Sequence, residues 1–433
     1  METSSPSKIR FSENFTHSAS SNWIEHPMVA RVVVINDASV ARGGATGLAC
    51  LSMRLLRERG FPVTAVVGDE GQNPEFPDLD VEVVALGMHE LVKTSKWKAA
   101  TRGLYNKTAR DLLQNWISEN DTSETVYHVH GWSKILSPSI FDALRPVADR
   151  TIVHAHDFFL ACPNGAFMDY QALSPCDRVP LGFSCLSKHC DKRSYPQKLW
   201  RVSRQMRLSK SFDKTAPWSK IVMIHEKMAP YFESAGYAPA FLKTIRNPAE
   251  GFSDARVQAE NNKEFVFVGR VEAEKGIEEL IAGAEAADVP LKVIGDGPLR
   301  EKLSQQHPKM SFSGWKNRQE ISQLIANARA LVMPSRYPEP FGLVVAEASA
   351  SGLPILISRT AFLSEQVAEE GLGFAFDARD TNMITHTLKK LRDLPHDDVK
   401  AMSERGFSRQ VVLAHAPGDW IAELISSYEA ALA

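Results

Sequence analysis

The sequence predicts an α/β protein made of two Rossmann-like domains. Three observations support this fold class. Short runs rich in β-branched residues alternate with segments of helical periodicity, a glycine-rich loop follows the first such run, and the same alternation starts again in the second half of the chain. The length of 433 residues agrees, because domains average roughly 150 residues.

In the first half, Val29–Ile35 reads as a buried strand, Gly43–Gly47 as a glycine loop and Leu48–Arg59 as a helix. Apolar runs of strand length then recur with helix-length spacers, as expected for a parallel sheet. We expect the further strands of this domain at Val63–Val67, Val81–Ala85, Thr125–Val129, Thr151–Ala155 and Lys220–Ile224.

The second half repeats this rhythm from Phe265–Val268 onward. Three further strands are expected at Leu291–Ile294, Ala330–Met333 and Pro354–Ile357. The helices between them are expected at Ile277–Ala287, Glu320–Ala328 and Leu343–Ser351.

Composition shifts along the chain set the expected domain boundaries. A polar, serine-rich leader occupies residues 1–28, and a polar, helix-poor stretch with a plausible hinge function occupies residues 246–262. The helical pattern near the end has apolar residues on one face, so we expect that helix to cross a domain boundary. The expected units are the leader 1–28, an amino-terminal domain 29–245, a linker 246–262, a carboxyl-terminal domain 263–410 and a final helix 411–433.

The composition excludes several classes of protein. Hydrophobic residues make up 44% of the chain and charged residues 24%, which is typical of globular proteins and not of disordered or fibrous ones. No apolar run approaches the roughly 20 residues that span a bilayer, and the leader lacks the apolar core of a secretory signal. We therefore expect a cytoplasmic protein with reduced thiols.

Charged residues follow the first strand of the second domain. Arg270 and Lys275 lie in the segment Gly269–Gly276, directly after the strand end where parallel sheets bind ligands. The two cations are suited to hold a diphosphate. Taken alone, however, the pattern is more typical of a solvent-exposed charge pair. Gly295 begins a third glycine-containing loop, which follows the next strand.

A longer motif follows the strand Ala330–Met333. Its prolines favour an extended segment, and Gly342 permits a close approach of the backbone to a ligand before a helix starts at Leu343. The free amides of a helix start bind anions. Glu347 lies about one turn into that helix, where its carboxylate can accept hydrogen bonds from the two hydroxyls of a ribose, or can simply stabilise the helix dipole.

Taken in order, these loops resemble the glycosyltransferases of family 4, which are retaining enzymes with the GT-B fold of two Rossmann-like domains facing a cleft. The match runs Gly-Arg, Lys-Gly, Gly-x-Gly-Pro and Pro-Ser-x-x-Glu-x-Phe-Gly, and the resemblance extends over nearly the whole chain from Val29. The resemblance implies that Arg270 and Lys275 hold the donor diphosphate. It also implies that Glu347 binds the ribose and that Glu339 and the Phe341-Gly342-Leu343 backbone bind the transferred sugar.

In the amino-terminal domain, Gly43 and Gly44 resemble the glycine pair of the family that lies beside the donor phosphates and the acceptor. His130 resembles the histidine at the end of the fourth strand that faces the sugar, whereas His128 fits a place in the core. His156 and Asp157 resemble the end of the next strand, where a purely structural role is an equal alternative.

Four of the five cysteines lie close together in the sequence, in a segment that starts shortly after Asp157. Four thiolates are able to bind Zn²⁺ tetrahedrally and to stabilise a long loop. The spacings include no Cys-x-x-Cys pair, so a set of buried thiols remains the alternative. The residues of this predicted structural zinc site, within the Cys-rich loop 162–190, are Cys162, Cys176, Cys185 and Cys190.

Two basic stretches account for the positive balance of the first half. Residues 188–214 hold nine lysines and arginines, and residues 93–110 contain no acidic residue. In the first stretch, basic residues recur every third position beside an apolar stripe, as in a basic amphipathic helix. The stretches are suited to an anionic membrane surface or to an acidic acceptor, or they are solvated faces. Nucleic acid is not expected, because no recognised module appears.

The expected function is transfer of a sugar, with retention at the anomeric carbon, from a nucleoside-diphosphate sugar to a glycan or lipid-linked acceptor in cell-surface polysaccharide biosynthesis. No cofactor or catalytic metal is expected, because Asp78-Leu79-Asp80 precedes its strand instead of following one. A location at the inner face of the plasma membrane would suit a lipid-linked acceptor. The alternatives are an inactive nucleotide-sugar-binding partner protein and a nucleotide-sugar epimerase of the same fold.

Overall fold

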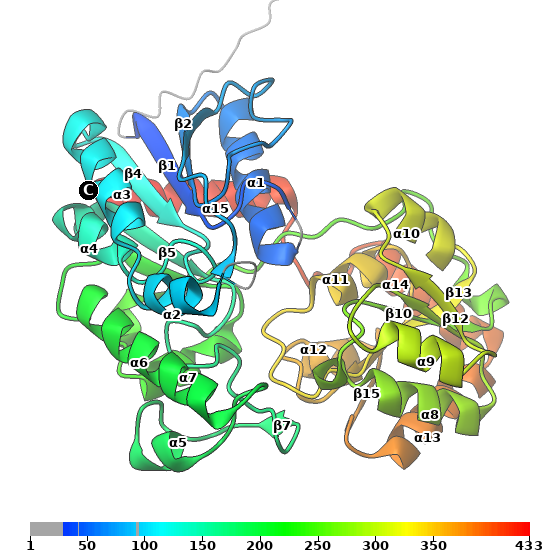
Figure 1. Cartoon of the computed structure of the whole chain (residues 1–433). Coiled ribbons are helices and arrows are strands. Elements are labelled where there is room, and N and C mark those ends of the chain that lie inside the picture. Colours follow the sequence, from blue (N-terminus) through cyan, green and yellow to red (C-terminus); the bar gives the residue numbers. More distant parts are fainter. Residues whose placement is uncertain (1–28, 42, 92–94) are drawn as a thin grey trace, which may run out of the picture.

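The computed structural model describes residues 29–433 apart from 42 and 92–94, so the expected leader 1–28 lies outside the described residues. Two α/β lobes lie side by side, each built around one parallel sheet (Figure 1). The predicted fold class is therefore confirmed. Within the described part of the chain, no helix is both long and apolar enough to cross a membrane.

The first lobe contains a seven-stranded parallel sheet in the order β3-β2-β1-β4-β5-β8-β9. Its strands are β1 Arg31–Asn36, β2 Val63–Val67, β3 Glu82–Ala85, β4 Thr125–Val129, β5 Thr151–Ala155, β8 Lys220–Met223 and β9 Leu242–Thr244. The strands β2, β4 and β5 are buried at every position, which explains their unbroken apolar pattern. The strand order reverses between β1 and β4, and such a switch point is where open α/β sheets bind ligands.

Helices flank this sheet on both faces, and a short hairpin lies in the Cys-rich loop. The hairpin strands are β6 Met168–Asp169 and β7 Ser174–Pro175. The helices are α1 Gly44–Glu58, α2 Lys96–Leu104, α3 Lys107–Asn120, α4 Ile140–Leu144, α5 Phe183–Ser187, α6 Tyr195–Ser211 and α7 Ala229–Ser234.

The second lobe contains a six-stranded parallel sheet in the order β12-β11-β10-β13-β14-β15. Its strands are β10 Glu264–Val268, β11 Leu291–Ile294, β12 Ser311–Gly314, β13 Ala328–Met333, β14 Ile355–Ser358 and β15 Gly373–Phe376. The sequence pattern did not predict the two edge strands, β12 and β15. Both are short, contain glycine and are only partly buried, so their apolar signal is weak.

The helices of the second lobe are α8 Ile277–Ala287, α9 Arg300–Gln306, α10 Arg318–Ile325, α11 Leu343–Ala350, α12 Ser364–Glu369, α13 Thr381–Asp393 and α14 His396–Phe407. Helix α10 begins and ends earlier than expected. Asn317 and Glu320 form a reciprocal capping box that fixes its start. Its end is set by β13, which takes up the chain from Ala328.

The last helix, α15 Pro417–Leu432, returns to the first lobe as predicted (Figure 1). Trp420, Ile421, Leu424 and Tyr428 are buried in one apolar cluster with residues of α1 and the first sheet. A second connection thus joins the lobes beside residues 246–262. The two connections pair at Ala249, whose amide donates to the His415 carbonyl at 3.1 Å.

The prediction that α6 presents a basic outer face above an apolar stripe is wrong. Lys198 is fully buried and Arg204 is 7% exposed, whereas Leu199 and Met206 are 46% and 61% exposed. Basic residues spaced by three drift by about 60° per step around a helix of 3.6 residues per turn, so they do not share one outer face. Their charges are instead used inside the lobe, as in the 2.7 Å ion pair between Arg201 and Asp191.

The second basic stretch is described only in part. Lys93 lies outside the described residues, and the side chains of Lys96 and Lys98 are not described either. On α2, Trp97 is 85% exposed. The binding of this stretch to an anionic surface therefore stays a prediction.

Candidate functional site

Three loops of the second lobe pack tightly where the strands end. At Gly295, a Cβ atom would lie 1.8 Å from the Gly269 carbonyl oxygen. At Gly276, where φ is +70°, it would lie 2.0 Å from the Pro334 carbonyl oxygen. Only glycine fits either position, so these glycines bring the loops after β10, β11 and β13 together.

Lys275 and Glu339 lie at the centre of this assembly. The Lys275 ammonium donates to Glu339 Oε2 at 2.6 Å and to the Tyr337 hydroxyl oxygen at 2.8 Å, and the Ser335 hydroxyl donates to the same carboxylate oxygen at 3.1 Å. Burial raises the pKa of Glu339, but the Lys275 charge and these hydrogen bonds outweigh it and lower the pKa overall. The loop therefore holds a paired, ionised carboxylate and a cation below the surface.

Arg270 is placed differently from Lys275. Its side chain is 65% exposed and pairs only with Glu272, at 2.9 Å, among the described residues. The two cations expected to form a diphosphate clamp thus lie in the same loop but share no direct partner. Lys275 is held in position by the protein, whereas Arg270 is accessible to a ligand.

The motif after β13 forms the predicted turn and helix. Phe341 is buried, Gly342 has a left-handed backbone with φ of +71°, and α11 begins at Leu343. On the fifth residue of α11, Glu347 accepts a 2.6 Å hydrogen bond from Arg318. Burial raises the pKa of Glu347, opposed by the Arg318 charge.

Sequence reasoning missed Tyr337, Ser335 and Arg318. Tyr337 and Ser335 lie inside the recognised motif, so a search for hydroxyl groups near Glu339 would have found them. Arg318 lies 29 residues before its partner Glu347 and gave no local signal.

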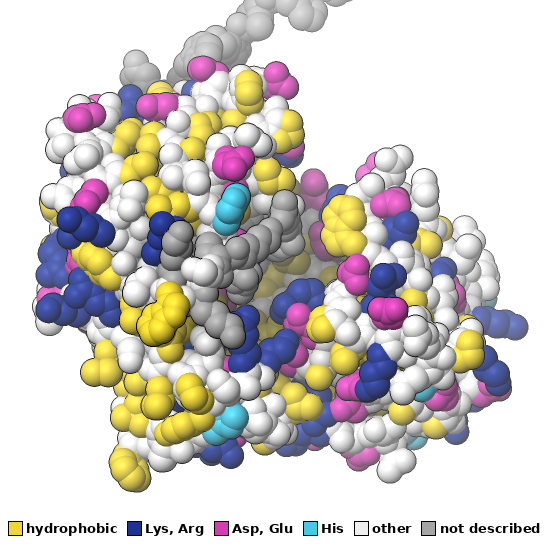
Figure 2. Space-filling view, in the orientation of Figure 1, with side chains coloured by type: hydrophobic (Ala, Val, Ile, Leu, Met, Phe, Trp, Pro, Cys, Tyr) yellow, Lys and Arg dark blue, Asp and Glu magenta, His cyan; other side chains and the backbone are white. Residues whose placement is uncertain are grey.

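The glycine loop of the first lobe reaches the second lobe. At Gly44, a Cβ atom would lie 3.2 Å from Leu343 Cδ1, so the starts of α1 and α11 are in near contact across the two lobes. Gly43 has no neighbour within 4 Å of a Cβ position. In the space-filling view, dark blue and magenta side chains gather in the hollow between the lobes (Figure 2).

A cavity of about 520 Å³ lies at the carboxyl edge of the first sheet, and its described lining comes from the first lobe alone. It contains Gly43, Gly44, His130 and His156. The structure thus brings the predicted amino-terminal residues together. It places His130 and Glu339 on opposite lobes, with no described contact between them.

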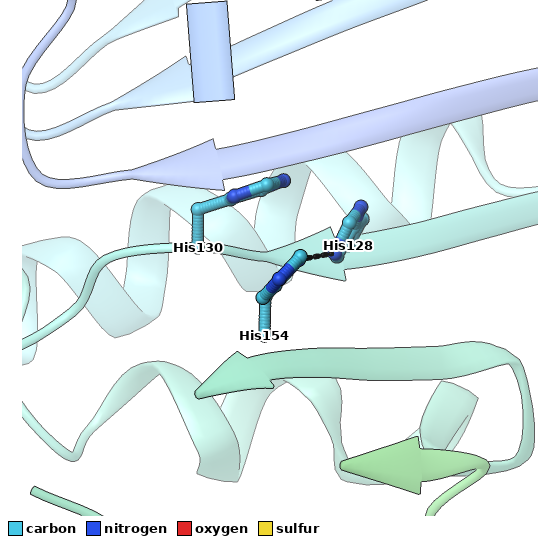
Figure 3. A group of neighbouring side chains, drawn as sticks. All are labelled: His128, His130 and His154. Atoms are coloured by element: carbon cyan, nitrogen blue, oxygen red, sulfur yellow. Dashed lines mark hydrogen bonds between the residues drawn. The ribbon is translucent and has the colours of Figure 1, made fainter. Parts of the chain in front are cut away.

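Histidines from β4, from its carboxyl end and from β5 form a buried cluster, and His130 and His154 of this cluster line the cavity. Figure 3 shows His128, His130 and His154, of which His128 Nε2 and His154 Nδ1 share a hydrogen bond of 3.2 Å. On its other side, His128 Nδ1 bonds the Tyr428 hydroxyl of α15 at 2.8 Å. Burial lowers the pKa of His128 to about 3 and keeps the other two neutral.

His130 also contacts two further side chains, those of His156 and Ser52. Its Nδ1 atom lies 2.9 Å from His156 Nε2, and its Nε2 atom lies 3.5 Å from the Ser52 hydroxyl. The ring is only 4% exposed and is fixed from two sides. A neutral, oriented imidazole of this kind can donate or accept a hydrogen bond, but it is poorly suited to carry a positive charge.

The predicted four-thiolate zinc site is not assembled in this structure. Among the described residues, only the three histidines form a group of three or more metal ligands within 4.8 Å of one another. The buried Lys198 ammonium instead donates to Cys190 Sγ at 3.1 Å and to Cys185 Sγ at 3.5 Å. These contacts fit the alternative of buried thiols, and zinc binding by the four cysteines stays a prediction. Burial accordingly raises the pKa of Cys162 to about 11.

The Cys-rich loop and the residues directly after it connect the lobes. Lys192 Nζ lies 2.6 Å from Glu274 Oε1, and the Leu173 carbonyl accepts from Arg336 Nε at 3.2 Å. Both partners belong to loops of the candidate donor site. The loop therefore places first-lobe backbone and charge against the loops that carry Lys275.

Comparisons with known proteins agree with this geometry. Residues 251–409 match the family model of glycosyl transferases group 1. Glycogen synthase of Mycobacterium tuberculosis is 28% identical over 261 residues, which cover 56% of this chain and 60% of the relative. The sulfoquinovosyl transferase SQD2 of Arabidopsis thaliana is 34% identical over 161 residues, or 35% of this chain and 31% of that protein. The chain thus spans less than two thirds of each of these relatives.

Solved structures match over almost the full chain. Sucrose-phosphate synthase of Thermosynechococcus elongatus superposes with a TM-score of 0.66 at 17% identity, covering 91% of this chain and 97% of the other. WaaG, a glycosyltransferase involved in lipopolysaccharide biosynthesis, superposes with a TM-score of 0.63 at 16% identity, covering 90% and 99%. The chain therefore has the GT-B fold, and its residues 251–409 are similar to the glycosyl transferases of group 1.

Proposed function

We propose that the chain is a retaining glycosyltransferase of family 4 that transfers a sugar from a nucleoside-diphosphate sugar to a hydroxyl of an acceptor. The observation that carries this proposal is the set of three loops packed together at Gly276 and Gly295. With the helix start after Gly342, they present cations and free amides at the strand ends of the segment that matches the group 1 model. The neighbour HepE of Anabaena was solved with UDP and glucose, which agrees with a nucleotide-sugar donor.

The leaving diphosphate gains negative charge during transfer, and three features of the second lobe favour that charge. Lys275 supplies a fixed cation, Arg270 an accessible one, and the free amides at Leu343 an anion-binding helix start. Preorganised donors of this type lower a barrier by roughly 3–4 kcal/mol each. In this proposal the charge is stabilised without a metal ion.

Glu347 is proposed to accept hydrogen bonds from the ribose hydroxyls. Its carboxylate already accepts one hydrogen bond from Arg318, which is held by the carbonyl groups of Glu250 and Gly251 and so keeps the carboxylate oriented. Glu339 is proposed to orient the transferred sugar together with the backbone at Phe341 and Gly342. Because Glu339 is already bonded to Lys275, it orients a hydroxyl better than it would attack an anomeric carbon.

The first lobe is proposed to bind the acceptor in the cavity that contains His130. Burial lowers the pKa of His130 well below its usual value, so the ring is a weak base and suits a hydrogen bond to the sugar better than a role as general base. Retention would then follow from attack on the same face as the leaving diphosphate, which itself takes the acceptor proton. Cell-surface polysaccharide assembly is the proposed pathway, as for the neighbour WaaG in lipopolysaccharide biosynthesis.

The test is donor turnover by the wild type and by Arg270→Ala, with Arg54→Ala as the matched control. Arg54 is also an exposed arginine paired with one glutamate, at 2.6 Å from Glu75, but it lies on α1 away from the loops. We expect Arg270→Ala to lower turnover about 100- to 1000-fold and the control to match the wild type. Turnover of Arg270→Ala within threefold of the wild type would refute the proposed role.

A further inference from the structure

A second cavity of about 670 Å³ lies between α2 and α6 of the first lobe. The two helices lie beside each other in Figure 1, and the Trp200 indole of α6 donates to the Ala100 carbonyl of α2 at 3.0 Å. This cavity shares four lining residues with the cavity that contains His130, so the two adjoin. The shared residues are Glu90, Ser133, Lys134 and Phe159.

The lining of this second cavity includes a buried arginine without a bonded counter-ion. Arg204 is 7% exposed, and among the described residues it forms no ion pair. Its Nη2 atom donates to the Ser133 carbonyl at 2.6 Å, whereas its Nε atom is buried and has no hydrogen-bond partner. Burying a charge without a bonded partner is costly, so such a group usually has an anionic ligand.

Aromatic rings and distant carboxylates compensate the Arg204 charge only in part. The guanidinium carbon lies 5.2 Å from the Trp132 ring centroid and 5.8 Å from that of Trp200. Burial lowers the pKa of Arg204 to about 10, although the charges of Asp37 and Asp157 oppose this shift. The Asp37 carboxylate is itself engaged, because it accepts backbone hydrogen bonds from the segment 134–136.

Three more cations line the same cavity. Arg201 pairs with Asp191, but neither Lys134 nor Arg193 has a carboxylate within ion-pair distance in the described part of the chain. Glu90 is the one acid among the described lining residues. The described lining therefore carries a net positive charge. The planar guanidinium group of arginine can donate two parallel hydrogen bonds to the oxygens of a phosphate ester.

We propose that this cavity binds a phosphate group of the acceptor through Arg204, Arg193 and Lys134. The proposal rests on the proposed glycosyl transfer and names its acceptor class: a molecule whose phosphate lies between α2 and α6 while its hydroxyl lies in the adjoining cavity beside His130. Lys134 lines both cavities and marks the path between them.

A phosphate ester can come from a soluble sugar phosphate or from the headgroup of a lipid. The exposed Trp97 of α2 and Leu199 of α6 lie on the two helices that form the cavity. The experiment therefore needs both kinds of probe.

The test measures binding of inorganic phosphate and of glycerol phosphate to the full chain by calorimetry, without any donor. Lys134→Ala and Arg193→Ala are the test variants, because neither side chain is held by a described ion pair and both should fold. Lys210→Ala is the matched control, since Lys210 is an exposed lysine of α6 that does not line the cavity. We expect each test variant to lose affinity about tenfold to a hundredfold and the control to keep it.

A wild type that binds neither probe, or test variants that bind as tightly as Lys210→Ala, would overturn the proposal. Vesicles of phosphatidylcholine with and without phosphatidic acid form the second arm. If the acidic vesicles compete with inorganic phosphate for the cavity, the phosphate comes from a lipid. If only glycerol phosphate competes, it comes from a soluble molecule. Both outcomes agree with a phosphate site. Failure of glycosyl transfer itself is detected separately, by donor turnover of the wild type compared with Arg270→Ala, because that assay does not measure phosphate binding.

Discussion

Replacing Lys275 by methionine tests the arrangement at the centre of the candidate donor site. The substitution leaves the Glu339 carboxylate, whose side chain is 13% exposed, with only hydroxyl partners from Tyr337 and Ser335. Removing one member of a buried ion pair costs about 3–5 kcal/mol. Because both side chains keep some exposure, we expect about 3 kcal/mol, so a Lys275 variant tests stability as well as turnover.

A double-mutant cycle isolates the contribution of this pair. Lys275→Met, Glu339→Gln and the double variant are unfolded in urea, with intrinsic fluorescence and circular dichroism as probes. We expect the double variant to be less destabilised than the sum of the single variants, with a coupling energy of about 2–3 kcal/mol. A Lys275→Met protein within 1 kcal/mol of the wild type, or a coupling energy below about 0.5 kcal/mol, would refute the pairing.

Three further predictions follow from the geometry. Burial lowers the pKa of His154 well below its usual value, so the residue takes up a proton at pH 5 only when the protein unfolds. The free energy of unfolding should therefore fall by about 2 kcal/mol per such histidine from pH 7 to pH 5. His154→Asn should reduce this pH dependence, and an equal pH dependence in the variant and the wild type, measured by urea unfolding, would contradict the prediction. Gly276→Ala should lower donor affinity, and it should lower the free energy of unfolding by about 2 kcal/mol or more, because its methyl group would lie 2.0 Å from the Pro334 carbonyl oxygen. A variant with the melting temperature and the donor-induced thermal shift of the wild type would exclude such a clash. Arg318→Ala should leave burial unopposed in raising the pKa of Glu347, so donor binding in calorimetry should be lost at a higher pH than in the wild type; identical pH profiles would exclude that coupling.

Much of the fold could be predicted because its central strands are buried on both faces. The strands β2, β4, β5 and β11 and the helix α8 have the predicted bounds. Parallel strands covered by helices need unbroken β-branched or apolar runs, and this requirement is visible in the sequence. The partly buried edge strands β12 and β15 of the second sheet lack such runs.

The site could be predicted only as far as its local motifs extend. Gly295 directly follows β11, and Gly276 and Gly342 lie in the loops after β10 and β13. The structure uses each as a close contact or a left-handed turn. The partners of the charged residues could not be predicted in the same way. Arg318 meets Glu347 from another helix, and no sequence period relates the two.

Tertiary burial also bears on two features that sequence spacing suggested. The spacing of basic residues on α6 suggested an outer face, yet Lys198 and Arg204 lie inside the lobe. The four clustered cysteines suggested zinc, yet Lys198 donates to two of the thiols, Cys185 and Cys190. In both cases the deciding partner comes from tertiary packing, which composition and spacing do not encode.

The central claim is that the second lobe binds a nucleoside-diphosphate sugar with Glu347 on its ribose. The most direct measurement is a thermal-shift panel of UDP-, GDP-, ADP- and TDP-linked sugars against the wild type and Glu347→Gln. We predict that one donor class stabilises the wild type, by about 2.7 kcal/mol at 100 times its dissociation constant, and that Glu347→Gln loses most of that shift. No shift with any donor, or an equal shift in the variant, would contradict the claim.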